Sequence, residues 1–155
     1  MRKFKVGILT LSDGREVVHQ ELQLVTRGFQ DRLVETLLAT GEVEPVVAQE
    51  IIWTVELARD EAVRLAHEGC EVTILNFAVW SFPHLAVIAS RFAPGPFLLF
   101  SNINPRYPGM VGMLAAAGAL DQIGVPHGRI FGDIRDPEVL RKVLAFIRAA
   151  SAINR

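Results

Sequence analysis

The sequence lacks the signatures of several common protein classes. Its 155 residues include a single cysteine, Cys70, so neither an internal disulfide framework nor a CxxC metal site is possible. It has no GxGxxG motif after the first apolar run and no GxxxxGKS/T motif, which argues against the usual nucleotide-binding loops. The net charge of -1 gives no electrostatic reason to expect nucleic acid or an anionic membrane as a partner.

Long apolar runs and a leader sequence are also missing. No uninterrupted apolar stretch approaches the roughly 20 residues that cross a bilayer. The first strand pattern begins at Phe4, almost at the start of the chain, and a signal peptide is not visible. We therefore expect no membrane association and a cytoplasmic location.

Histidine is present, but not at the spacings that bind metals. No HxH or HExxH pattern occurs among the four histidines, which are His19, His67, His84 and His127. We therefore predict no metal site in this stretch. His19 or His84 beside a serine such as Ser12 or Ser101 would make a base and a nucleophile, although no GxSxG motif accompanies them. A small independent enzyme is thus one hypothesis for the function.

Hydrophobic side chains are abundant. They make up 50% of the residues, and the mean hydropathy is +0.30. Such a composition is typical of a parallel sheet that is covered on both faces, because its strands are apolar throughout. It also suits a domain that rests against another protein surface. The length is that of one domain of ordinary size.

Short apolar runs alternate with segments of helical periodicity. The predicted strands are residues 4–11, 46–48, 72–76, 97–100 and 129–131. A helix is predicted after each of them, from about residues 18, 54, 83, 110 and 137. This alternation predicts an α/β fold with three layers and a doubly wound, five-stranded parallel sheet. Right-handed crossovers favour the flavodoxin-like strand order 2-1-3-4-5.

Local signals mark the faces and ends of these helices. Thr54 and Asp136 are good N-caps, and Gly41 stands where a helix stop belongs. In the first helix, apolar residues recur at spacings of three and four and predict one face. That face consists of Val18, Leu22, Val25, Phe29, Leu33 and Leu37.

Three loops after predicted strands carry unusual polar and aromatic residues. They are residues 12–15, 76–84 and 101–109. In a parallel sheet the loops after the strand ends lie along one edge, which is where ligands bind. We therefore predict a binding rim there. Asp133, after the fifth strand, could also reach it.

Each candidate residue has a functional and a structural interpretation. Arg15 either donates hydrogen bonds to hydroxyl or carboxylate groups or is a solvated residue in an Asp-Gly turn. Trp80 either stacks on a sugar ring or covers the core. Asn102 and Asn104 carry amides that suit a polyhydroxylated ligand, or they bond to nearby backbone in turns.

The rim segments resemble a known family. Residues Ser12–Arg15, Asn76–Pro83, Gly95–Gly118 and Phe131–Ile134 are similar to the amino-terminal domain of the L-fucose isomerase and L-arabinose isomerase group. The resemblance extends over essentially all of the sequence and is closest to the fucose isomerase branch. It implies an α/β domain with a parallel sheet, in agreement with the pattern of strands and helices.

The resemblance also implies an activity. Members of the family interconvert aldoses and ketoses with a bound divalent metal, typically manganese, whose ligands lie in later domains. Their active site forms between subunits, and the first domain contributes an arginine and a tryptophan to sugar binding. Those residues match Arg15 and Trp80. The expected partners are a monosaccharide, the remaining domains of the chain and neighbouring subunits of a homo-oligomer.

We therefore expect residues 1–155 to form a single α/β domain that is the N-terminal part of a longer chain. The last residues, from Ala149 on, still have a helical pattern without a stop. The expected role is substrate capping and oligomerisation, with catalysis and metal binding outside this stretch. The substrate-binding residues are predicted to be Arg15, Trp80, Asn102 and Asn104. The alternative is a free-standing sugar-binding module without catalysis.

Overall fold

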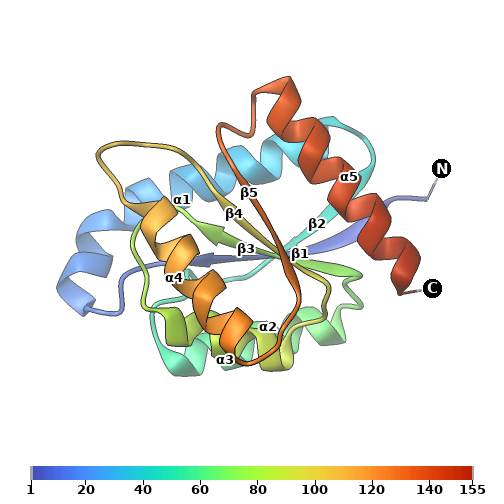
Figure 1. Ribbon diagram of the computed structural model, residues 1–155. Coiled ribbons are helices and arrows are strands. Elements are labelled where there is room, and N and C mark those ends of the chain that lie inside the picture. Colours follow the sequence, from blue (N-terminus) through green and yellow to red (C-terminus); the bar gives the residue numbers. More distant parts are fainter. Residues whose placement is uncertain (1, 155) are drawn as a thin grey trace.

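Strand and helix alternate along the whole of residues 2–154, the part of the chain that the computed structural model describes (Figure 1). The strands are β1 (Phe4–Leu11), β2 (Val43–Val47), β3 (Val72–Phe77), β4 (Phe97–Ser101) and β5 (His127–Phe131). The helices are α1 (Glu16–Ala39), α2 (Val55–His67), α3 (Pro83–Phe92), α4 (Gly109–Gln122) and α5 (Pro137–Ile153). Every predicted strand and helix is present, with ends that differ by a few residues.

The strands form one parallel sheet in the order β2-β1-β3-β4-β5, which confirms the predicted order. Ile8 of β1 pairs with Val47 of β2 on one side and with Ile74 of β3 on the other. The chain leaves β1 toward β2 and then crosses back to β3. The crossovers therefore diverge between β1 and β3, and a crevice opens at the carboxyl ends of the strands near such a point.

Helices cover both faces of the sheet, as expected for three layers. One face carries α2, α3 and α4, and the other carries α1 and α5 (Figure 1). Alternate residues of each strand point to opposite faces of the sheet. Leu9 and Leu75 pack against α2, α3 and α4, whereas Ile8 and Ile74 pack against α1 and α5. Among residues 2–154, no helix is both long enough and apolar enough to cross a membrane.

Only two of the six positions in the predicted face of α1 are buried. Leu33 and Leu37 are buried, whereas the four apolar positions before them are partly exposed. The buried residues of the earlier turns are His19, Thr26 and Gln30. The reason is length: 24 helical residues span about 36 Å, whereas the eight of β1 span only about 26 Å. The first turns of α1 therefore extend past the sheet and pack on polar loops.

The predicted helix caps are confirmed. The Thr54 hydroxyl accepts a hydrogen bond from the amide of Leu57 at 3.2 Å, at the start of α2. The Asp136 carboxylate accepts one from the amide of Glu138 at 2.9 Å, at the start of α5. Gly41 ends α1 with a φ of 72°, a conformation that glycine adopts without strain.

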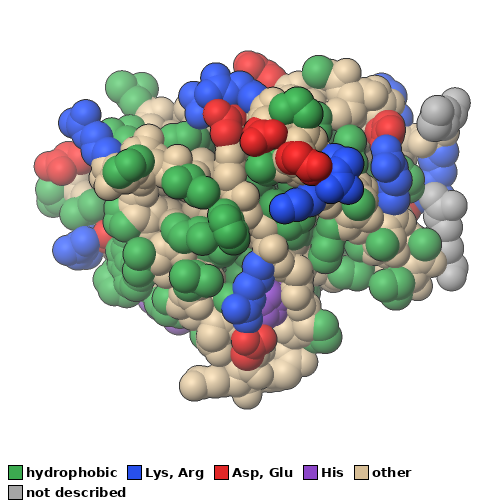
Figure 2. Space-filling view, turned by 45° about the horizontal axis from the view of Figure 1, so that its top comes forward, with side chains coloured by type: hydrophobic (Ala, Val, Ile, Leu, Met, Phe, Trp, Pro, Cys, Tyr) green, Lys and Arg blue, Asp and Glu red, His purple; other side chains and the backbone are tan. Residues whose placement is uncertain are grey.

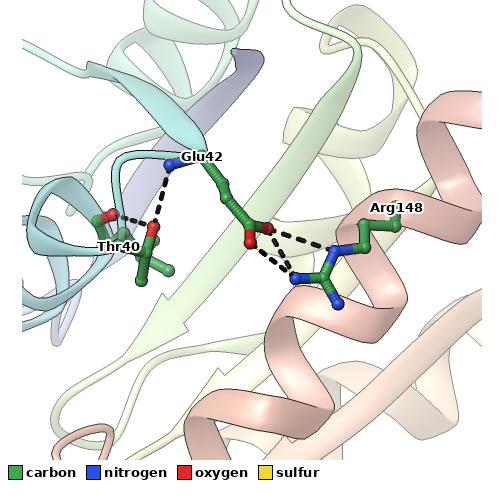
Figure 3. A network of polar contacts seen from close by, with 4 residues as sticks. Thr40, Glu42 and Arg148 are labelled. Carbon is green, nitrogen blue, oxygen red and sulfur yellow. Dashed lines mark hydrogen bonds and ion pairs between the residues drawn. The ribbon is translucent and has the colours of Figure 1, made fainter. Parts of the chain in front are cut away.

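An ion pair joins α5 to the turn between α1 and β2, at the amino end of the strands (Figure 3). The guanidinium of Arg148 donates to both carboxylate oxygens of Glu42, at 2.7 Å for each from one nitrogen. The Glu42 amide in turn donates to the Thr40 hydroxyl at 3.2 Å. The contacts fix the end of α5 against the turn that begins β2.

Candidate functional site

Two loops at the carboxyl edge of the sheet share an Asp-x-Arg arrangement. After β1, the Asp13 carboxylate accepts from the backbone amide of Arg15 at 2.9 Å and from its guanidinium at 2.9 and 2.6 Å. After β5, Asp133 accepts from the amide of Arg135 at 2.9 Å and from its guanidinium at 3.1 and 2.8 Å. Each loop thus holds an arginine in one orientation. The paired motif is visible in the sequence, although only Arg15 was predicted from it.

These contacts keep both carboxylates ionised. Hydrogen bonds from the Arg135 guanidinium lower the pKa of Asp133 to about 2. The Arg15 guanidinium lowers the pKa of Asp13 in the same way. Arg15 uses two of its five N–H donors on Asp13, and its side chain is 65% exposed. Among residues 2–154, no partner is seen for its remaining donors.

The loops of Arg15 and Trp80 meet at Phe82. A Cβ atom on Gly14, next to Arg15, would lie 3.0 Å from the Phe82 ring. The indole of Trp80 lies edge-on to the same ring, with 6.0 Å between centroids. Trp80 itself is half-buried. The structure therefore brings the arginine and tryptophan loops, the first and second loops of the predicted rim, side by side.

Two glycines of α4 hold the Trp80 loop in place. A Cβ atom on Gly109 would lie 2.4 Å from the carbonyl oxygen of Phe77, and one on Gly112 would lie 3.0 Å from the amide nitrogen of Ser81. Both obstacles are backbone atoms, which cannot swing aside as a side chain can. Only glycine lets the start of α4 approach the loop this closely.

Asn102 and Asn104 lie elsewhere on the rim, in the wall of a cavity of about 220 Å³. Asn76 of β3, Arg32 of α1 and Asp133 also contribute to its lining. The cavity lies at the carboxyl ends of β3, β4 and β5, on the face of the sheet that carries α1. Arg15 and Trp80 do not line it. The structure therefore separates the four predicted residues into two pairs.

The two asparagines of the cavity differ in their surroundings. The Asn104 side-chain oxygen accepts a hydrogen bond from the backbone amide of Arg106 at 2.9 Å, which is the turn contact of the structural interpretation. Asn102 is only 7% exposed, and within residues 2–154 neither polar atom of its amide has a hydrogen-bond partner. Buried amides are rarely left in this state. Asn102 is therefore a buried amide without a described partner, in the wall of the cavity.

A comparison with known protein families shows to which family the chain belongs. The family model described as "L-fucose isomerase, first N-terminal domain" matches residues 3–155. The chain belongs to this family. The resemblance of the rim segments is thereby confirmed, and the fold that it implied is the one observed. Among curated proteins, none matches the chain.

The histidine and serine hypothesis loses its support within this family domain. Ser12 and Ser101 are both fully buried, and Ser101 donates to the carbonyl of Phe77 at 3.1 Å. His19 is buried beside Ser12, with 3.1 Å between Nδ1 and the hydroxyl, and burial lowers its pKa. His84 is exposed at the start of α3, with its ring facing Phe82. No accessible serine therefore lies beside a histidine base among these residues.

The domain also offers no ready metal site in its described part. Within residues 2–154, no three His, Cys, Asp or Glu side chains are grouped as metal ligands would be. The Cys70 thiol is buried, and burial raises its pKa to about 11. The residues present here therefore do not fit the divalent metal that the family implies.

Proposed function

We propose that this chain is the substrate-capping domain of an isomerase that interconverts an aldose and a ketose. Arg15 donates hydrogen bonds to sugar hydroxyls, and Trp80 packs against the apolar face of the sugar ring. Asn102 and Asn104 shape the neighbouring part of the rim. The observation that carries this proposal is the family match over residues 3–155.

The geometry of the rim supports these roles. Asp13 holds the Arg15 guanidinium in one orientation while leaving three N–H donors unused. The edge-on contact with Phe82 limits the movement of the Trp80 indole. Both side chains are thus positioned before a sugar arrives, which lowers the entropy that binding must overcome.

Exposed hydrophobic side chains support a role in assembly. On α4, β5 and the adjoining loops, large apolar residues are about half exposed or more: Ile103, Val111, Leu114, Ile123 and Phe131. Figure 2 shows hydrophobic side chains gathered on this side of the molecule, between groups of charged residues. We propose that other domains or subunits of a homo-oligomer cover this surface.

Under this proposal the reaction centre lies outside the domain. The divalent metal, with manganese expected, would polarise the substrate oxygens there. The domain would close over that centre, exclude water and hold the sugar through Arg15 and Trp80.

The test uses the protein expressed from its whole gene. Trp80→Ala should raise KM for the sugar about tenfold, the equivalent of about 1.4 kcal/mol, because the ring loses its packing surface. Arg15→Gln should raise KM in the same direction. The metal requirement should stay unchanged in both variants. L-fucose and L-arabinose, assayed with Mn²⁺, are the first substrates to compare.

Phe92→Ala is the matched control, since Phe92 is another partly exposed aromatic residue, at the far end of α3. It should leave KM and kcat unchanged. Unaltered constants for Trp80→Ala and Arg15→Gln would remove both residues from the sugar site. Binding of sugar by the whole gene product without any turnover would favour a binding module instead.

A further inference from the structure

The cavity that contains Asn102 has a polar lining and three strands beneath it. Asn76 lies on the same face of the sheet as Ile74, by the alternation of side chains along β3, and Asn102, directly after β4, lines the same cavity. Asn76 is held there by a hydrogen bond from its amide nitrogen to the Thr10 hydroxyl, at 3.1 Å. The base of the cavity is therefore built from rigid strand ends.

The unpartnered amide of Asn102 defines what the cavity accepts. An amide presents an N–H donor and a carbonyl acceptor, and here both are buried without a partner among residues 2–154. Leaving such groups unsatisfied costs stability. A ligand that satisfies both must itself offer an acceptor and a donor, as a molecule with an oxyanion and a hydroxyl group does.

The charges around the cavity favour an anion. Asp133 accepts three hydrogen bonds from Arg135, and the positive charge of Arg32 also helps to lower the pKa of Asp133. Arg32 lies over the Phe29 ring, 5.1 Å from its centroid, and within residues 2–154 its guanidinium has no carboxylate partner. Two guanidiniums and one carboxylate leave a net charge of +1. Arg32 therefore has donors available for an oxyanion.

The volume limits the size of the ligand. A cavity of about 220 Å³ holds roughly seven water molecules at about 30 Å³ each. A molecule of three to five carbons with one anionic group fits a cavity of that size.

We propose that this cavity binds a small hydroxylated oxyanion, a carboxylate or a phosphate ester, between Arg32 and Asn102. The site is separate from the pair Arg15 and Trp80, and it needs no isomerase activity to operate. Its occupant would satisfy the Asn102 amide and neutralise the excess charge of the two arginines. A bound anion there gives the domain a second ligand besides the sugar.

The test is a titration of the 155-residue chain, followed by calorimetry and by amide chemical shifts. The probes are glycerol 3-phosphate, glycerate, inorganic phosphate and glycerol. Binding of glycerol 3-phosphate identifies a phosphate ester, and binding of glycerate identifies a carboxylate. Inorganic phosphate should bind more weakly and glycerol not at all. Shifts should occur at Asn76, Asn102 and Asp133.

Two variants and a control make the result decisive. Arg32→Gln should weaken binding of the anion at least tenfold, because it removes the unpaired cation. Asn102→Leu should weaken it at least tenfold while keeping the charge. Arg59→Gln, on the opposite face of the sheet, should change nothing. No binding of either anion at about 10 mM, or equal binding of glycerol, would overturn the proposal.

Discussion

The two edges of the sheet use the same side chain in opposite ways. At the amino edge, the amide of Asn154 donates to the carbonyls of Glu71 and Gly95, at 2.6 and 2.9 Å. These carbonyls lie just before β3 and β4, so the amide ties two strand starts to α5. At the carboxyl edge, the amide of Asn102 is buried at the end of β4 and bonds to nothing in the described protein. One amide stabilises the fold, and the other has no described partner, as the proposed ligand site would require.

The same contrast holds for the arginines. Arg148 joins α5 to Glu42 at the amino edge and so connects distant parts of the chain. Arg15 and Arg135, at the carboxyl edge, bond to an aspartate two residues away in their own loops. A local pair adds little to the stability of the whole domain, but it orients a cation toward solvent. In these examples, a long-range pair fastens the amino edge, whereas local pairs orient cations at the carboxyl edge, where we propose ligand binding.

The largest effect is expected from closing the gap between α4 and the Trp80 loop. Gly109→Ala places a methyl group 2.4 Å from the Phe77 carbonyl oxygen, so backbone must move. We expect a loss of about 2–3 kcal/mol in the free energy of unfolding, typical of overpacking. Urea denaturation followed by circular dichroism measures it.

Gly118→Ala is the control on the same helix. A Cβ atom at Gly118 meets nothing within 4 Å, so the substitution should stabilise the domain by about 0.5–1 kcal/mol through helix propensity. Equal stability of Gly109→Ala and the unaltered chain would show that the carboxyl edge yields more easily than the distances imply.

Much of the fold could be predicted from the sequence, because its signals are local. The apolar runs around Ile8 and Ile74 mark buried strands, and Thr54 and Asp136 mark helix starts through contacts within three residues. The right-handed crossover rule then leaves few strand orders to consider. The predicted strands, helix caps and strand order are confirmed.

The arrangement of the rim could not be predicted in the same way. Asn102 and Asn104 share a cavity with Arg32 of α1, whereas Arg15 and Trp80 do not line it. This division depends on how α1 and the loops pack together in space. The apolar spacing within α1 carries no information on which loops its overhanging turns pack against. The buried polar stripe that begins with His19 was missed for the same reason.

The second prediction exchanges the two amides for leucine. Asn102→Leu should raise the free energy of unfolding of the ligand-free chain by about 1 kcal/mol, because it removes a buried, unsatisfied amide. Asn154→Leu should lower it by about 1 kcal/mol, because two carbonyls lose their donor. Thermal unfolding of both variants beside the unaltered chain shows whether each substitution raises or lowers the free energy of unfolding.

Changes of opposite sign in the free energy of unfolding would establish that the Asn154 amide stabilises the fold and the Asn102 amide does not. Asn102 would then be retained at some cost in stability. If Asn102→Leu destabilises the chain as much as Asn154→Leu does, then the amide at the carboxyl edge is structural. The idea of a ligand site there would then lose its main support.

The smallest effect concerns the long-range ion pair at the amino edge. A double-mutant cycle with Arg148→Ala and Glu42→Ala should give a coupling energy of about 0.5–1 kcal/mol, since the pair is bidentate but partly exposed, 51% and 29% for the two side chains. The coupling should shrink in about 1 M salt, where the screening length is about 3 Å. A parallel cycle on Arg59 and Asp60, neighbours on the surface of α2, should show no measurable coupling. Equal coupling in the two cycles would mean that linking distant segments adds nothing to the pair, and that the amino edge owes its stability to the Asn154 amide and to packing instead.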